Sequence, residues 1–500
     1  MNEMASQISK ETMDLYKAAF GRPDADLLKA WVQSGSAVSG ITAYDLEAPA
    51  KLLFPVLTPL RNMIPRVAGK GGIQANWRAV TGINVNNQSL GVSEGNRGGV
   101  TATTVKDYLA VYVELGLEDS VTWKAQYAAQ GFDDVLALAT DNLLKSTMIG
   151  EEQLILAGQG TFGLGLTPQP SCTPIATLGS LTNAASPYTV YCVALNYWGY
   201  KRSTLRNLVQ DITRTNADGS SDTFGGGSAQ VSLGQPATIP GGGVTAGSIT
   251  ATVAAVPGAV AYAWFWGPNA GAVKLGAITT VNQVVITALA SGTVDLSTLD
   301  TTLDHSANSL EFDGFFAQIA KTGSGSYMRS LDGAVLTSGK DGSIVEFDDA
   351  LQSFWDNYRL SPTSIWVGSQ EDRNIRSKIM NSASLTGAMR FVFNAVQGQI
   401  VGGSMAVSYL NPFAMSGDAK AIPINLHPNI PNGTVMFLTD VLPYPMSNVT
   451  NVFQMLLRQD YFAITWPMVK RKREYGVYLD GVLQHYFPPS MGTISNIGNG

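Results

Sequence analysis

The stretch ITATVAAVPGAVAYAWFW, residues 249–266, has no charged side chain and lies in a longer segment, residues 223–294, whose only charged residue is Lys274. Gly, Ala, Thr, Ser and Val make up most of this segment. The sequence on either side has ordinary charge density and long helical patterns. We therefore interpret residues 159–306 as a module inserted into a first body, whose two halves flank it.

Apolar residues alternate through the second half of this insert and are bounded by turn residues, a pattern typical of short antiparallel strands. The alternating residues are Ile249, Ala251 and Val253, then Val260, Tyr262, Trp264 and Trp266, then Val284 and Ile286. This predicts a β-sandwich of immunoglobulin or fibronectin type. The aromatic face could pack in a core, which we favour, or bind carbohydrate. Pro257, Gly258 and Pro268 interrupt the apolar run, so we expect no transmembrane helix.

Length and composition indicate a folded protein with two or three cores, because 45% of the 500 residues are hydrophobic. The net charge of -6 argues against general electrostatic binding to nucleic acid or an anionic membrane. Residues 1–10 are polar and have no signal-peptide core, so we expect synthesis in the cytoplasm.

The first half of the flanking body begins with amphipathic helical patterns over residues 8–32, within a segment, residues 1–68, that reads as an N-terminal arm. Alternation over residues 72–122 then predicts a long hairpin with a polar tip at residues 82–99. Such a hairpin is marginally stable alone and usually gains order from a partner surface. Apolar spacing predicts a long helix over residues 125–158.

The second half mixes helices and strands. Ser343 and Glu346 match a capping box, which predicts a helix over residues 344–358. A short buried strand is expected at residues 364–367, and a helix capped by Ser369 should run to Met380. Strands are expected again at residues 435–438, 452–457 and 475–482.

No constellation of chemical groups predicts catalysis, a cofactor or a metal site. The three histidines, His305, His427 and His485, are dispersed. Cys172 and Cys192 could form one bridge, but we favour two free thiols. The paired acids lie in or near the starts of predicted helices, where we expect them to be solvated; they are Asp133–Asp134, Glu151–Glu152, Asp348–Asp349 and Glu371–Asp372. The string GQGTFG, residues 158–163, follows a helix and reads as a linker.

One basic run stands out: Lys470-Arg471-Lys472-Arg473. It could contact nucleic acid or an acidic neighbouring surface, or be a solvated strand end. For a self-assembling protein we favour ion pairing between subunits over DNA.

The element order resembles that of tailed-bacteriophage major capsid proteins of the Hong Kong ninety-seven fold. The strings that carry the resemblance are EEQLILAG at 151–158, LEFDGF at 310–315, PTSIWV at 362–367 and GTVMF at 433–437. The resemblance covers residues 1–158 and 307–500. It implies an α+β fold that an all-β insert interrupts at residues 159–306. Before the insert come an N-terminal arm (1–68), an extension loop with peripheral-domain strands (69–124) and a spine helix (125–158). After it come an axial domain (307–450) and a return into the peripheral domain (451–500).

This resemblance implies a structural protein without catalytic residues, cofactor or metal. The chain would assemble with copies of itself, through pentamers and hexamers, into an icosahedral head that encloses double-stranded DNA. Its other partners would be scaffold, portal and decoration proteins, with no membrane. It would be made in the host cytoplasm and reside in the virion capsid, with the insert displayed on the surface. Deletion of residues 165–305 should then leave assembly intact.

The resemblance also implies that some relatives crosslink a loop lysine to an asparagine. The tip at residues 82–99 contains no lysine, so this chemistry is not expected here. The alternatives are an encapsulin-like compartment shell, which would hold no DNA, and, with less support, a surface adhesin built on the insert. An α/β enzyme is the least favoured reading.

Overall fold

The structure is a computed structural model that describes residues 53–83, 90–129, 134–183, 187–243, 246–339, 342–380, 393–394, 399–400, 407–414, 420–444 and 447–500. The chain divides into two compact units, Met1–Phe54 with Ala125–Val135 and Pro55–Lys124 with Leu136–Gly500. Residues 1–52 of the predicted arm, residues 84–89 of the predicted tip and Asp133 lie outside the described residues. Nearly everything that the structure describes belongs to the second unit.

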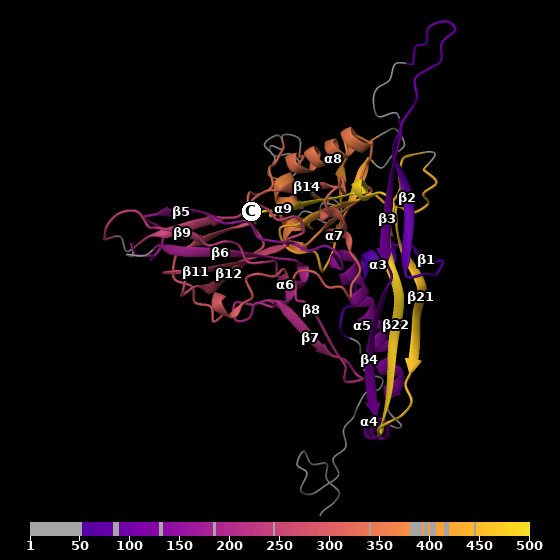
Figure 1. Ribbon diagram of the computed structural model, residues 1–500, viewed down its shortest axis with the longest axis horizontal. Coiled ribbons are helices and arrows are strands. Elements are labelled where there is room, and N and C mark those ends of the chain that lie inside the picture. Colours follow the sequence, from indigo (N-terminus) through magenta and orange to yellow (C-terminus); the bar gives the residue numbers. More distant parts are fainter. Residues whose placement is uncertain are drawn as a thin grey trace, which may run out of the picture. The chain divides into compact units, whose positions relative to one another are not determined.

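A four-stranded sheet brings together segments from both ends of this unit, in the order β1-β21-β22-β4. Its strands are β1 (Arg66–Ala68), β21 (Phe453–Thr465), β22 (Lys472–His485) and β4 (Val113–Thr122). β22 is antiparallel to both neighbours, and β1 is parallel to β21. The long β21–β22 pair is drawn in yellow in Figure 1. The predicted strands at 452–457 and 475–482 are confirmed, and both are longer than expected.

The predicted hairpin is also confirmed. Strands β2 (Gln74–Ile83) and β3 (Thr103–Val111) form a two-stranded sheet of their own, in which Trp77 pairs with Tyr108. Most of its residues are exposed on both faces. At its root, Trp77 stacks on Tyr108, and both rings meet the edge of His485 at the end of β22.

The helices of this part of the sequence are α3 (Pro59–Met63), α4 (Trp123–Ala128) and α5 (Val135–Ala157). The sequence had predicted one helix over residues 125–158. The described residues instead contain the short α4 and the 23-residue α5.

The insert contains two antiparallel sheets, ordered β13-β10-β5 and β12-β11-β6-β9. The strands are β5 (Ser171–Ile175), β6 (Tyr188–Leu195), β9 (Gln235–Ala237), β10 (Ser248–Thr252), β11 (Ala261–Gly267), β12 (Lys274–Thr279) and β13 (Gln283–Ile286). Both sheets contribute to one apolar core. Tyr262, Trp264 and Trp266 are buried in it, so core packing is confirmed for this face and no ring of the three is presented to a sugar. The assignment to the immunoglobulin or fibronectin type stays a prediction.

Further elements join the insert to the body: α6 (Tyr197–Arg202), the hairpin β7 (Asp211–Thr215) and β8 (Ser221–Gly225), and η1 (Leu296–Thr298). The two ends of the insert lie side by side, because Asn196 donates hydrogen bonds to the Gln159 side chain (2.8 Å) and to the Ser306 carbonyl (2.7 Å). The next residue, Tyr197, is buried in the main core of the body together with Val260.

A six-stranded mixed sheet follows, ordered β14-β23-β20-β15-β19-β18. Its strands are β14 (Tyr327–Ser330), β15 (Ser364–Val367), β18 (Ser408–Leu410), β19 (Ala421–Leu426), β20 (Val435–Leu438) and β23 (Met491–Ser495). The other elements of this region are α7 (Phe315–Ala320), α8 (Val345–Tyr358), α9 (Ser369–Met380), η2 (Pro488–Ser490) and the β16–β17 pair (Phe393–Asn394 with Gln399–Ile400). The predicted strands at 364–367 and 435–438 are confirmed, as is the α+β class.

Helix α8 is confirmed, but its predicted cap is wrong. Ile344 occupies the cap position, with no side-chain hydrogen bond. Glu346 instead turns into the body, where its Oε2 accepts a hydrogen bond from the Thr337 amide at 2.9 Å. At the start of α8 a tertiary contact therefore outweighs the local capping pattern. The predicted helix that starts at Ser369 and runs to Met380 is confirmed as α9.

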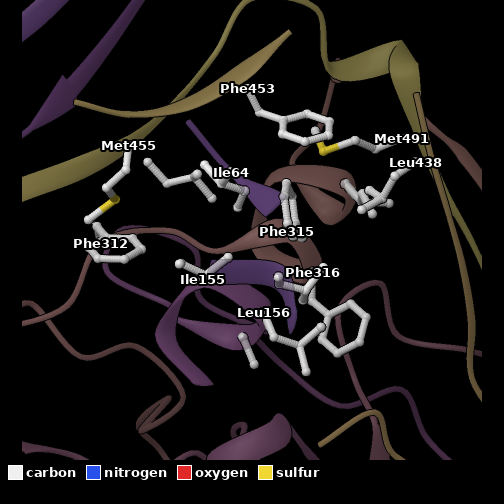
Figure 2. Packing of buried hydrophobic residues seen from close by; sticks show 14 of the residues in the cluster. Ile64, Ile155, Leu156, Phe312, Phe315, Phe316, Leu438, Phe453, Met455 and Met491 are labelled. Carbon is white, nitrogen blue, oxygen red and sulfur yellow. The ribbon is translucent and has the colours of Figure 1, made fainter. Parts of the chain in front are cut away.

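The main core lies where the C-terminal end of α5 meets α7 and β21 (Figure 2). Ile155 and Leu156 from α5 pack with Phe315 and Phe316 from α7. Phe315 meets Phe453 of β21 edge to face, with ring centroids 5.3 Å apart. This packing fixes the end of the long helix, and with it the two adjacent carboxylates described next.

Candidate functional site

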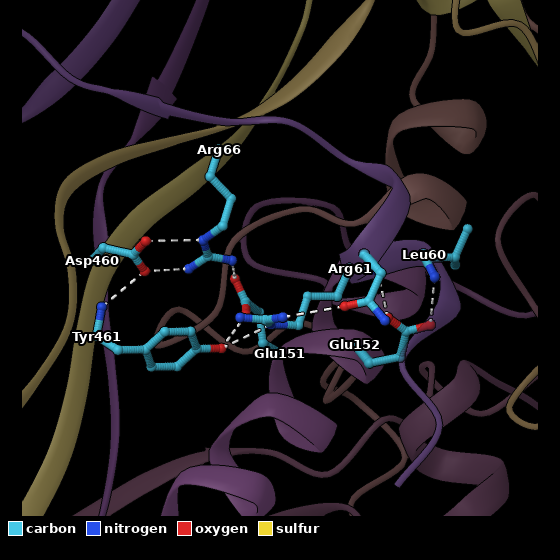
Figure 3. A network of polar contacts seen from close by, with 8 residues as sticks. Leu60, Arg61, Arg66, Glu151, Glu152, Asp460 and Tyr461 are labelled. Atoms are coloured by element: carbon cyan, nitrogen blue, oxygen red, sulfur yellow. Dashed lines mark hydrogen bonds and ion pairs between the residues drawn. The ribbon is translucent and has the colours of Figure 1, made fainter.

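The end of α5 carries a buried pair of acids that joins three other segments of the chain (Figure 3). The side chains of Glu151 and Glu152 have no exposed surface. The sequence analysis expected this pair to be solvated, and that expectation is wrong. Because each turn of α5 near Ala157 is packed into the core, acids on this face must find partners inside the protein.

Glu151 has two cationic partners. Its Oε2 lies 2.8 Å from Arg61 Nε, and its Oε1 lies 2.7 Å from Arg66 Nη1. The Tyr461 hydroxyl on β21 donates a hydrogen bond to Glu151, and the guanidinium groups of both arginines lie over the Tyr461 ring. Arg66 also pairs with Asp460 at 2.6 Å. The negative charges of Glu151 and Asp460 therefore balance the positive charges of the two arginines.

The contacts within this cluster raise the pKa values of Arg66 and Tyr461. Burial opposes the charge on Arg66, but hydrogen bonds to Asp460 and Glu151 and the charges of both acids outweigh it and raise its pKa. Burial, assisted by the charge of Glu151, raises the pKa of the Tyr461 hydroxyl, which therefore stays a donor. Within the described residues, each charged group of this cluster has a partner of opposite charge, and the cluster links α5 to β1 and β21.

Glu152 binds two different segments. Its carboxylate accepts hydrogen bonds from the backbone amides of Leu60 (3.0 Å) and Arg61 (2.7 Å), and from His427 Nε2 at 2.6 Å. The Asn429 amide donates to His427 Nδ1 at 3.1 Å. An imidazole that accepts at Nδ1 and donates at Nε2 is in one neutral tautomer. Glu152 thus ties α5 to the segment before β1 and to the loop after β19.

The other residues singled out in the sequence are not brought to one place. His305 pairs with Asp211 at 2.8 Å, and His485 lies partly buried at the hairpin root. Cys172 and Cys192 are free, and burial raises the pKa of Cys172 to about 11. Among the described residues, no group of three or more His, Cys, Asp or Glu side chains could hold a metal ion.

The remaining paired acids divide between the interior and the surface. Glu371 is fully buried, which contradicts the solvated reading; it accepts a hydrogen bond from the Gly433 amide at 3.0 Å. Asp348 accepts a hydrogen bond from Tyr409, whereas Asp349 forms a surface ion pair with Arg329. Asp134 is exposed.

The β2–β3 hairpin presents a large apolar surface. Exposed apolar residues occur along both strands and in the described residues that connect them, where Leu90 is 88% and Val100 is 86% exposed. Among single chains such a surface usually marks an interaction site. One contact steadies the hairpin within the chain: Lys106 donates to the Gly323 carbonyl at 2.7 Å.

The basic run lies at the turn between β21 and β22. Lys472 pairs with Glu474, and Arg473 lies over the Trp123 ring. The side chains of Lys470 and Arg471 are exposed. Met468 and Val469 beside them are exposed as well. The turn therefore combines cations with apolar groups, which is typical of a protein contact.

Beside β4 lies a hollow with a volume of about 1150 Å³. Residues of α5, β22 and the β7–β8 hairpin share its lining with β4. No helix in the described regions is both long and apolar enough to span a bilayer.

No family model matches the chain, and no curated protein is similar to it. Among solved structures, it is similar to the capsid of a native GTA particle, with 8% identity, a TM-score of 0.41, and coverage of 93% of this chain and 100% of that chain. It is similar to the capsid of the Myoviridae phage XM1 (8% identity, TM-score 0.40, 90% and 95% covered). It is also similar to the capsid of the cyanophage P-SCSP1u (8% identity, TM-score 0.39, 96% and 99% covered).

Proposed function

We propose that this chain is the major capsid protein of a tailed bacteriophage. It assembles with copies of itself, through pentamers and hexamers, into an icosahedral head around double-stranded DNA. In this reading β2–β3 is the extension loop and α5 the spine helix. The sheet β1-β21-β22-β4 belongs to the peripheral domain, and the six-stranded sheet to the axial domain. Scaffold, portal and decoration proteins are its proposed further partners, and the chain assembles in the host cytoplasm and resides in the virion capsid.

The observation that carries the proposal is the β2–β3 hairpin. It is a two-stranded sheet with apolar side chains exposed on both faces, projecting from a body whose long helix is anchored by paired buried charges. A lone two-stranded hairpin is marginal in water, so a partner surface must cover it. A repeated contact between one projecting arm and a different surface of the next copy generates rings and closed shells.

Charge supports the same reading. A net charge of -6 gives no general attraction for a polyanion, so a packaged genome would be enclosed without being held by the whole protein surface. The exposed Lys470 and Arg471 offer a local contact for an acidic surface on a neighbouring copy.

The test is electron microscopy and sizing chromatography of the chain expressed alone and with its cognate lysate. Closed shells, or rings of five or six copies, are expected. A monomer of about 53 kDa that persists at high concentration and with lysate would exclude the proposal. Shells purified from the source that hold protein cargo and no DNA would instead identify an encapsulin-like compartment.

A deletion variant tests whether the β2–β3 hairpin is the assembly contact. Replacement of residues 81–104 by a short turn removes the projecting part of the hairpin and keeps Trp77 and Tyr108, which pack on the body at its root. Shell formation should be lost while the free energy of unfolding of the body stays close to that of the full chain. Intact shells from this variant would show that the hairpin is not the assembly contact.

A further inference from the structure

The sheet β13-β10-β5 of the insert ends in a strand with a free edge. β13 pairs with β10 on one side, and no strand in the described residues pairs with its other side. The Val253 amide donates to the Asn282 carbonyl at 2.9 Å, so every second residue of β13 after Asn282 bonds to β10. The amide and carbonyl of Val285 therefore point away from β10, toward the free edge.

β13 has none of the features that keep sheet edges apart. Its sequence, QVVI, contains no charged residue and no proline, whereas the opposite end strand β5 contains Pro174. Edge strands of natural proteins usually carry lysine, proline or a bulge, because an unprotected edge pairs with any other strand that it meets. The edge of β13 therefore has the composition of a strand that is paired in the assembled protein.

Three exposed apolar side chains flank this edge: Val285 (55% exposed), Leu289 (58%) and Leu178 (77%). The turn that carries Leu178 lies beside the end of β13, since the Ser180 amide donates to the Thr287 carbonyl at 2.6 Å. Leu178 has a φ of 69°, a left-handed conformation that leucine rarely adopts and glycine adopts freely. A strained and exposed leucine gains nothing within its own chain, which indicates a contact with another molecule.

The surface around the edge carries almost no charge. Lys274 is the only charged residue in the strands of the two sheets, and its Nζ lies 4.0 Å from an Asp295 carboxylate oxygen. Charge is the main property that keeps copies of a soluble protein apart. Two copies of this surface can meet without burying an unpaired charge, and a charged partner would find no group here to pair with. The occupant that fits is the same edge of a second copy.

The body of the protein holds β13 in place. Asn282, directly before the strand, is 3% exposed and donates a hydrogen bond to Asp332, after β14, at 2.7 Å. The Gln283 side chain lies against Gly333 in the same loop. A contact at β13 therefore acts on the body as well as on the insert.

We propose that β13 pairs with β13 of a second copy across a two-fold axis, as antiparallel strands with Val285 opposite Val285 of the partner subunit. In this register Leu289 lies opposite Val281 of the partner subunit. The inference rests on the proposed self-assembly and goes beyond it, because it gives the insert a task in the shell. Contacts within a ring are heterologous, whereas a two-fold contact is isologous and joins one ring to the next.

The first test exchanges charges at the axis. Val285→Glu alone places two acids opposite each other, and Val285→Lys alone places two cations. Each variant should raise the concentration needed for shell formation at least about tenfold, because like charges that face each other across an interface repel. An equal mixture of the two variants should assemble at a lower concentration than either variant alone. Leu233→Glu and Leu233→Lys, at a 66% exposed site elsewhere on the insert, are the controls and should leave assembly unchanged.

The second test is crosslinking of Val285→Cys in assembled particles with a short bismaleimide. A residue beside a two-fold axis meets only its own copy, so the gel should show a linked dimer and no larger species. Leu233→Cys and the natural chain are the controls. The natural thiols should not react, since Cys192 is fully buried and burial raises the pKa of Cys172 to about 11.

Normal shell formation by both charge variants, or equal dimer yields from Val285→Cys and Leu233→Cys, would overturn the β13 contact and leave the capsid function standing. Loss of shells from both charge variants without recovery in the mixture would also overturn it, since the edge would then meet a partner other than itself. Failure of the natural chain to form any particle would instead remove the proposed function on which the contact rests.

Discussion

Glu152 and His427, 275 positions apart in the sequence, meet in a hydrogen bond of 2.6 Å with no exposed surface on either side chain. This contact joins the end of the long helix α5 to the loop after β19. The neighbouring Glu151 joins the same helix to β21 and to the segment that enters β1. The two acids therefore set the position of α5 relative to both main sheets.

Replacing Glu151 by Ala should lower the free energy of unfolding by about 3–5 kcal/mol, because it leaves Arg61 and Arg66 without their buried partner. Urea unfolding of the unassembled protein measures this. Glu94→Ala, at the exposed tip, is the matched control and should change stability by less than about 0.5 kcal/mol. Equal small effects would mean that the buried cluster does not hold the helix.

Acidification should destabilise the protein through His485. Burial lowers the pKa of His485 to about 3. The positive charges of Lys321 and Lys106 also lower it, whereas the negative charge of Asp313 raises it. In the unfolded chain a histidine binds its proton at about pH 6.5. The contribution of His485 to the free energy of unfolding is therefore fully present above that pH. It falls by about 1.4 kcal/mol for each pH unit below about 6.5, until the pH reaches the pKa of His485 in the folded protein.

His485→Phe keeps an aromatic ring against Trp77 and Tyr108 and removes the titrating group. Its free energy of unfolding should change much less than that of the natural protein between pH 6.5 and 5.5, a window above the titration of most carboxyl groups. Parallel pH profiles for the two proteins would assign the acid sensitivity elsewhere.

Tyr197 tests whether the insert shares the core of the body. Tyr197→Ala should cost about 3–5 kcal/mol, as for other large aromatic side chains removed from a core. Tyr197→Phe is the matched control. The Tyr197 hydroxyl is buried without a partner among the described residues, so its loss should be neutral or slightly stabilising.

The same packing changes the expected result of deleting residues 165–305. The sequence suggested that assembly would survive. Because the deletion removes Tyr197 and Val260 from the main core, we now expect an aggregated or unfolded product. Soluble, assembling protein from this deletion would show that the insert is a separable decoration after all.

Lys470→Ala with Arg471→Ala should leave the fold unchanged, since both side chains are exposed. If these cations pair with a neighbouring copy, assembly of the natural protein should weaken as the salt concentration rises from about 0.05 to about 0.5 M, because screening becomes strong over this range. Assembly of the double variant should depend less on salt. Lys70→Ala, another exposed cation, is the control. An unchanged salt dependence in the double variant would exclude this contact.

Local patterns predicted the parts of this protein that depend on near neighbours. Alternation located β10, β11 and β13 in the insert and the paired strands of the β2–β3 hairpin, because a strand with one buried face must alternate. Phe347, Leu351 and Phe354, spaced at one helical face, predicted α8, and all three are buried. The ends of helices were less predictable, as Ile344 at the start of α8 shows.

The sequence by itself determined several helices and strands, among them α8 and the β2–β3 hairpin, and that a nearly uncharged module interrupts a charged one, since these follow from side-chain periodicity and composition. Only the tertiary structure decided that Glu151, Glu152 and Glu371 are interior, and that the insert reaches into the main core through Tyr197. A carboxylate tolerates burial only where distant partners converge on it, and no local pattern specifies residues that lie hundreds of positions away.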